Sequence, residues 1–321
     1  MLSRHFAIAM GSRVLTGATT IGVSMILASA FAPESFAGFR FYQITLVMLA
    51  AVAGPGISLS ASKLFALFTS NAADDAPPVA LFCAVGTGIA AVVAMLLHLV
   101  PQAVFAQALP VSISLLAMGV FLTAARAVPI GAMIGLQRFG SILLIDAMTT
   151  VLLLVGVVLA IQMQDIKVAV WALIVAQAIG LMAAYFSIFS IISWSDLVEN
   201  FRVRRRSVDV KRVLAIAGPN AVIAVFISLQ FWGIGRVILA SYEEAIVFAA
   251  FSIGVQWFSL AAMVPEVLGR TVFPKIIVQI KDGSAAAQDA KRRLSKKVMI
   301  LVFASTVGVT LGAFFTAPYL I

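Results

Sequence analysis

The side chains with the most chemical potential are a few ionisable residues that lie within or beside long apolar segments. Arg126 lies deep in one such segment, Asp146 lies early in the next, and Arg40 and Arg236 lie near the ends of two others. A charge at the centre of a bilayer costs about 2.5–3.5 kcal/mol on insertion scales, so it usually faces a cavity or a partner. Guanidinium groups bind phosphate in a planar, bidentate way. The arginines therefore predict a cationic cavity for an anionic substrate, and the alternative for Arg126 is an ion pair with Asp146.

Two further features leave alternatives open. Arg40 and Arg236 would instead anchor their helices at the membrane interface if no cavity reaches them. The uncharged polar residues in or near the apolar segments either line a cavity or form hydrogen bonds between helices, because a buried amide needs a partner. These residues are Gln43, Asn220, Gln230 and Gln256.

The sequence contains no recognisable motif for catalysis, metal binding or nucleotide binding. The single cysteine, Cys83, excludes an intrachain disulfide framework, and the two histidines, His5 and His98, are far apart. No phosphate-binding glycine loop of the Walker type and no GxSxG motif is present. The sequence predicts a carrier rather than an enzyme, with no catalytic residue, no metal and no cofactor.

Composition predicts the elements that must hold these side chains. Of the 321 residues, 62% are hydrophobic and only 11% are charged, whereas a soluble domain has about 25% charged residues. Segments of about 20 apolar residues can each cross the bilayer as a helix. We expect an all-α, polytopic transmembrane bundle of about nine spans, at residues 14–32, 41–68, 79–100, 111–134, 141–161, 168–193, 213–240, 245–264 and 298–318.

The basic residues predict how these spans are oriented. With the N-terminus inside, most of the 22 lysines and arginines lie on the inner side, and only Arg40, Lys167 and Arg236 lie outside. This is the distribution that the positive-inside rule requires. The net charge of +9 therefore indicates topology and contact with anionic lipids, and does not indicate nucleic acid binding.

An internal repeat predicts two halves. Residues 26–39 read ILASAFAPESFAGF, and residues 238–251 read ILASYEEAIVFAAF. Each copy joins two spans, and both copies have the same orientation, which is typical of parallel repeats in transporters. We therefore expect a six-helix N-terminal lobe at 1–200, a basic cytoplasmic connector at 201–212 and a partial C-terminal lobe at 213–321. Three spans stand in the second half where the first has six, so the chain reads as truncated, or alternatively as a nine-span protein.

Several short motifs resemble those of one family. The chain is similar to the polysaccharide exporters and Wzx-type oligosaccharide flippases of the multidrug/oligosaccharidyl-lipid/polysaccharide superfamily, which is MATE-like. The segments that carry the resemblance are Phe36-Ala37-Gly38-Phe39, the stretch GISLSASK at 56–63, GLQRF at 135–139, Gly218-Pro219, GRVIL at 235–239 and Phe273-Pro274.

The resemblance implies a function and a location. It implies two helical lobes around a central cavity, and alternating access that moves an undecaprenyl-diphosphate-linked oligosaccharide across the bacterial inner membrane. Arg126, Arg236 and Arg40 would bind the diphosphate or acidic sugars, and the polysaccharide polymerase machinery would be a partner. Two alternatives remain: a cation-coupled MATE-like exporter of small molecules, and a truncated membrane protein without transport activity.

Overall fold

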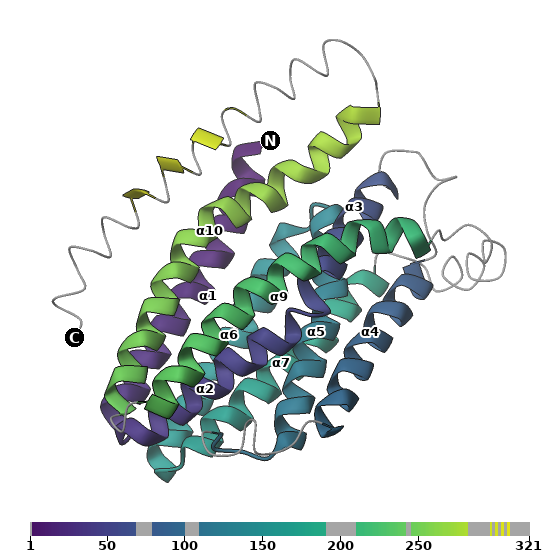
Figure 1. Ribbon diagram of the computed structural model, residues 1–321. Helices are drawn as coiled ribbons and strands as arrows, with labels where there is room; N and C mark the ends of the chain where they lie inside the picture. The colour runs from purple at the N-terminus through teal and green to yellow at the C-terminus, as the bar shows by residue number, and fades with distance from the viewer. Residues whose placement is uncertain are drawn as a thin grey trace.

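The computed structural model describes residues 2–68, 79–99, 109–190, 210–241 and 245–281, together with a few positions between 296 and 308. These residues form helices and turns, with no strand among them. The long helices run alongside one another as a single bundle (Figure 1). This confirms the all-α class that the apolar segments predict.

Eight of the predicted spans coincide with helices. The helices are α1 (Leu2–Ala30), α2 (Pro33–Ala50), α3 (Gly54–Phe68), α4 (Val79–Leu96) with the 3-10 turn η2 (Leu97–Leu99), α5 (Ile113–Gly135), α6 (Phe139–Met163), α7 (Ile166–Phe189), α9 (Val210–Ser241) and α10 (Ala245–Lys281). Within the described residues, five helices are long and apolar enough to cross a membrane, or six if one bent pair counts as a span. The ninth predicted span and the connector at 201–212 lie outside the described residues, or almost wholly so, and the total of nine stays a prediction.

Two predicted spans differ from the helices that the chain forms. The second is a pair, α2 and α3, which meet at a bend of 48°. Gly54 and Pro55 open α3, where the missing amide hydrogen of proline is tolerated because the first turn lacks acceptors. The eighth predicted span ends at residue 264, but α10 continues to Lys281. Hydropathy detects only the apolar part of a helix, so it missed the polar extension.

Tight turns join α5 to α6 and α6 to α7. Gln137 and Gln164 adopt positive φ angles of 57° and 52° at these turns, and Gln164 is the C-cap of α6. Asp165 is the N-cap of α7 and accepts a hydrogen bond from the amide of Lys167 at 2.9 Å. These caps hold α5, α6 and α7 as neighbouring antiparallel helices.

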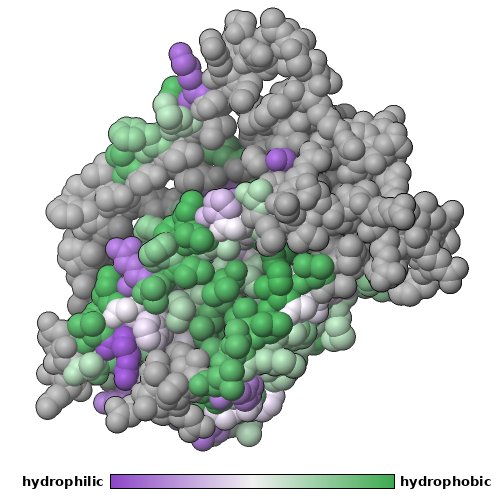
Figure 2. Space-filling model, turned by 45° about the vertical axis from the view of Figure 1, so that its right-hand side comes forward, coloured by the Kyte–Doolittle hydropathy of each residue, from purple (hydrophilic) through white to green (hydrophobic). Residues whose placement is uncertain are grey.

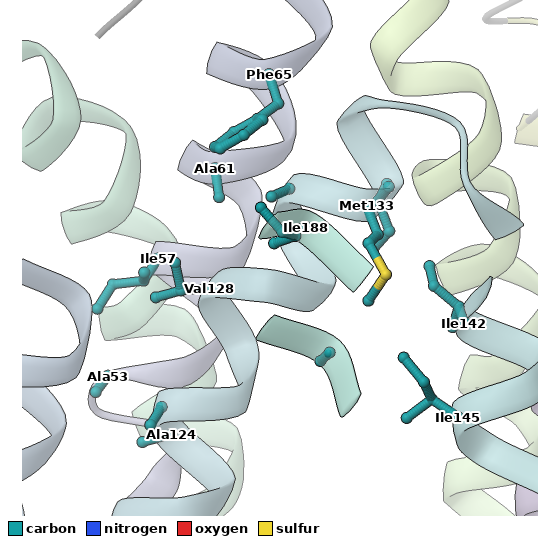
Figure 3. Packing of buried hydrophobic residues seen from close by; sticks show 14 of the residues in the cluster. Ala53, Ile57, Ala61, Phe65, Ala124, Val128, Met133, Ile142, Ile145 and Ile188 are labelled. Carbon is teal, nitrogen blue, oxygen red and sulfur yellow. The ribbon is translucent and has the colours of Figure 1, made fainter. Parts of the chain in front are cut away.

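The core is packed from small and branched side chains. Figure 3 shows Ile57 of α3 beside Val128 of α5, with Ala61 and Phe65 farther along α3 and Ile188 of α7 close by. α3 packs against α5 on one side and α9 on the other, while α1 packs against α6 and α10. α9 and α10 contact the rest of the bundle mainly through α3, α2 and α1.

Large hydrophobic side chains also cover the outside of the bundle. Leu144 and Val151 of α6, and Met182 and Phe186 of α7, are 58–76% exposed. Figure 2 shows a broad hydrophobic area on one face of the molecule. Soluble monomers rarely expose such areas, whereas a bilayer covers them. The outer surface is therefore that of a multi-pass membrane protein.

Candidate functional site

A cavity of about 900 Å³ lies inside the bundle. Its walls come from α1, α2, α3, α5, α6, α7, α9 and α10, and most of the lining side chains are apolar or small. Four charged residues of the described part of the chain line it: Arg13, Arg126, Asp146 and Glu266. Ligand sites in proteins commonly combine apolar walls with a few such polar groups, in volumes of roughly 300–1,000 Å³.

Arg126 and Asp146 form the most buried charged pair in this lining. Arg126 Nη2 donates to Asp146 Oδ1 at 2.8 Å, and each side chain is only 14% exposed. Arg126 Nη1 donates to Gln177 Oε1 at 3.1 Å, and Ser12 Oγ donates to the other carboxylate oxygen of Asp146. The pairing that was open from the sequence is therefore present, and it joins α1, α5, α6 and α7 in one polar network.

Gly180 of α7 provides the space for the Arg126 guanidinium. A Cβ atom at this position would lie 3.2 Å from Arg126 Cζ and 2.8 Å from Thr149 Cγ2. Such distances are too short for ordinary van der Waals contact, so a larger residue would displace the arginine. The absence of a side chain at Gly180 therefore lets the guanidinium lie directly against α7.

A second ion pair crosses from α1 to α10. Arg13 Nη2 donates to Glu266 Oε1, and the two side chains are 29% and 41% exposed. Because α1 belongs to the first half of the chain and α10 to the second, this pair joins the two halves beside the cavity. Each arginine of the described lining thus faces a carboxylate, and the four charges sum to zero. The described part of the lining is therefore neutral by formal charge, whereas the sequence predicts a cationic cavity.

The other predicted site residues lie elsewhere. Arg40 is only 4% exposed and bonds to Gln43 and to the carbonyl oxygen of Ser252 at 3.1 Å, and Gln256 is 7% exposed. Arg40, Gln43 and Gln256 are not among the described residues that line the cavity. Arg40 and Arg126 are therefore not brought into one site.

The three predicted residues of α9 do not line the cavity either. Asn220 and Arg236 are partly exposed, and Gln230 is exposed. The part of α9 that does line it carries Ala224, Ile227 and Ser228. Of the predicted set, Arg126 and Asp146 alone are among the described lining residues.

Sequence reasoning missed several residues of the site. Gln177 carried a visible signal, since it is an amide within an apolar span. Glu266 was missed because it lies two residues beyond the end of the predicted eighth span, at residue 264. Ser12 and Gly180 carried no signal, because small residues are common in membrane helices and their neighbours are fixed only by packing.

Comparison with solved structures identifies the fold of this chain, whereas comparison of sequences finds no match. No protein-family model matches the sequence, and no curated protein matches it. The structure is similar to the outward-facing conformation of a multidrug resistance MATE family transporter of the MOP superfamily. The TM-score is 0.68 and the identity 15%, and the match covers 99% of this chain and 73% of that one.

Two other solved structures are also similar. A MATE crystal structure in complex with MaD3S has a TM-score of 0.65 and 16% identity, over 99% of this chain and 73% of that one. The inward-facing conformation of a multidrug resistance MATE family transporter has a TM-score of 0.56 and 15% identity, over 98% and 69%. At these identities the likeness concerns the fold, and the chain has the fold of the MATE transporters.

Proposed function

We propose that this chain moves a substrate across a membrane by alternating access through the cavity beside Arg126. We further propose that the substrate is a lipid-linked oligosaccharide diphosphate of the bacterial inner membrane. The observation that carries the proposal is an open cavity of about 900 Å³ that is lined by helices from both halves of the chain. The MATE fold supports transport, and the short motifs shared with oligosaccharide flippases support the cargo.

Arg126 is the residue best placed to bind the diphosphate. Its guanidinium lines the cavity and donates one hydrogen bond to the Asp146 carboxylate, an anionic acceptor of the kind that a phosphate also offers. Asp146 keeps the guanidinium from being buried unpaired, which would be costly. A phosphate oxygen that replaces Asp146 would release that carboxylate to Ser12, which already donates to it.

The remaining parts of the substrate have suitable surroundings. The sugars would occupy the cavity, whose polar groups include Thr16, Ser58 and Ser228. The polyprenyl chain would stay in the bilayer, against the apolar outside of the bundle. The proposed partners are therefore membrane lipids and the polysaccharide polymerase machinery that receives the product.

The test is complementation of bacteria that lack an oligosaccharide flippase. The parent chain is expected to restore surface polysaccharide, and Arg126→Ala is expected to reduce it at least tenfold at equal membrane abundance. Arg138→Ala is the matched control, because Arg138 is exposed and does not line the cavity. Full polysaccharide with Arg126→Ala would refute this role of the arginine.

A specific observation favours a second function. Asp146 and Glu266 place two carboxylates in the cavity, and carboxylates of this kind can bind the cation of a cation-coupled exporter. A small-molecule exporter would protect cells from toxic cations, whereas a flippase would not. Drug-susceptibility assays with the parent and with Asp146→Asn separate the two functions.

A further inference from the structure

The two copies of the internal repeat meet at one end of the bundle and form an aromatic plug. Ala37 from the first copy packs in one cluster with Phe248 from the second, together with Phe41 of α2 and Trp232 of α9. The ring centroids of Phe41 lie 6.0 Å from those of Phe248 and 6.3 Å from those of Trp232. The plug therefore joins α2, from the first half of the chain, to α9 and α10 from the second.

A layer of polar contacts accompanies the plug. Trp232 Nε1 donates to Thr45 Oγ1 at 3.1 Å, and Arg40 Nη2 donates to the carbonyl oxygen of Ser252 at 3.1 Å. With its amide oxygen turned to the guanidinium, Gln256 accepts from Arg40 Nη1 at 3.0 Å and from Nη2 at 3.1 Å. In the same orientation Gln256 also accepts from Ser24 Oγ, which lies on α1. All of these contacts join a helix of the first half of the chain to a helix of the second half.

Plug and polar layer lie at one end of the cavity. On α10 the cavity lining begins at Phe258, after Gln256, and on α9 it ends at Ser228, about one helical turn before Trp232. The same order holds on α2, where Arg40 and Thr45 precede the first lining residue. The contacts therefore close the end of the cavity toward which α2 begins.

Arg40 differs from the two arginines of the cavity. Arg13 and Arg126 each pair with a carboxylate, whereas the acceptors around Arg40 in the described part of the chain are neutral oxygens. Two of these acceptors, Ser252 and Gln256, belong to α10. A buried cation that is stabilised by neutral oxygens needs each of these hydrogen bonds. A movement of α10 would therefore remove the two acceptors that Ser252 and Gln256 provide to Arg40.

We propose that Arg40 is the latch of a gate, and that the plug formed by Phe41, Trp232 and Phe248 is its seal. The gate closes one end of the cavity in this state and opens when α9 and α10 move away from α2. The proposal rests on alternating access, and it gives Arg40 a role in holding the halves together rather than in lining the cavity described above.

Cysteine reactivity at two reporters tests the gate. In a Cys83→Ala background, Ser252→Cys reports on the gate, because Ser252 is fully buried and contributes only its backbone oxygen to Arg40. Ala262→Cys reports on the part of the cavity farther from the gate, because Ala262 is exposed and lines the cavity beyond Phe258 on α10. Each reporter is combined with Arg40→Ala, with Gln256→Ala or with the control Gln230→Ala, and the purified protein is labelled with a maleimide.

The gate predicts opposite changes at the two reporters. Arg40→Ala and Gln256→Ala should raise labelling of Ser252→Cys at least fivefold and lower labelling of Ala262→Cys, because the chain shifts to the state in which the other end of the cavity is closed. Gln230→Ala should change neither. The proposal is overturned if Ser252→Cys does not react faster, or if it does so without a fall at Ala262→Cys, as local unfolding would produce. Since the assay needs no cargo, a failure of the proposed substrate would leave its result unaffected.

Discussion

At the scale of single residues, Asp146 decides the state of Arg126. The carboxylate accepts from the guanidinium and from Ser12, so it keeps two buried donors paired. Under the proposed function, the same contacts make it the group that an anionic ligand would displace. A single carboxylate would then contribute both to the stability of the bundle and to the affinity of the cavity.

Removing that carboxylate charge should destabilise the bundle. Asp146→Asn would leave Arg126 buried with a neutral partner, at a cost of roughly 3 kcal/mol for a broken buried ion pair. Thermal unfolding of the purified protein should therefore begin at lower temperature. The double change Arg126→Leu with Asp146→Leu should recover most of the loss, because it removes both charges. A double variant no more stable than Asp146→Asn would contradict this account.

At the scale of elements, α3 is fixed by close backbone approach. A Cβ atom at Gly131 of α5 would lie 2.3 Å from the carbonyl oxygen of Ser58, and one at Gly135 would lie 2.5 Å from that of Ser62. The two glycines, four residues apart, form the small-residue motif that lets membrane helices pack closely. The two glycines therefore let α5 pack closely against α3, the helix that follows the bend after α2.

A methyl group at this contact should push α3 away from α5. Gly131→Ala is expected to lower the unfolding temperature, although alanine is the better helix former by about 1 kcal/mol. Gly140→Ala is the matched control, since a Cβ there would meet nothing within 4 Å. The measurement is thermal unfolding of both variants side by side. Equal or greater stability of Gly131→Ala would show that the backbones can separate without cost.

The same elements show what a sequence can and cannot predict. Hydropathy located eight helical segments, one of which is the bent pair α2 and α3, because membrane helices need long apolar segments whatever they pack against. The glycines and proline at 54–56, which disfavour a continuous helix, stand at the bend between α2 and α3. The sequence placed Arg40 and Arg126 in one cavity, however, because both are arginines near the ends or centres of spans. Which helices are neighbours depends on small-residue contacts such as that of Gly180, and a single sequence does not reveal these.

At the scale of the whole molecule, the contacts between the halves fall at two levels. Arg13 and Glu266 join α1 to α10 beside the cavity, and the plug with Arg40 joins α2 to α9 and α10 at its end. Alternating access requires that such contacts form in one state and break in the other. The basic residues predict that the N-terminus of α1 is cytoplasmic. With that orientation, the plug faces the outside and the cavity lies toward the cytoplasm.

The most direct test of this account is substrate movement by the purified protein. The chain would be reconstituted into vesicles that carry a fluorescent polyprenyl-diphosphate oligosaccharide, and a membrane-impermeant quencher would measure how fast the lipid changes leaflet. The account predicts that the parent chain moves the lipid at least tenfold faster than protein-free vesicles, and that Arg126→Ala does not. Leaflet exchange no faster than in protein-free vesicles, from a correctly folded parent chain, would contradict the central claim.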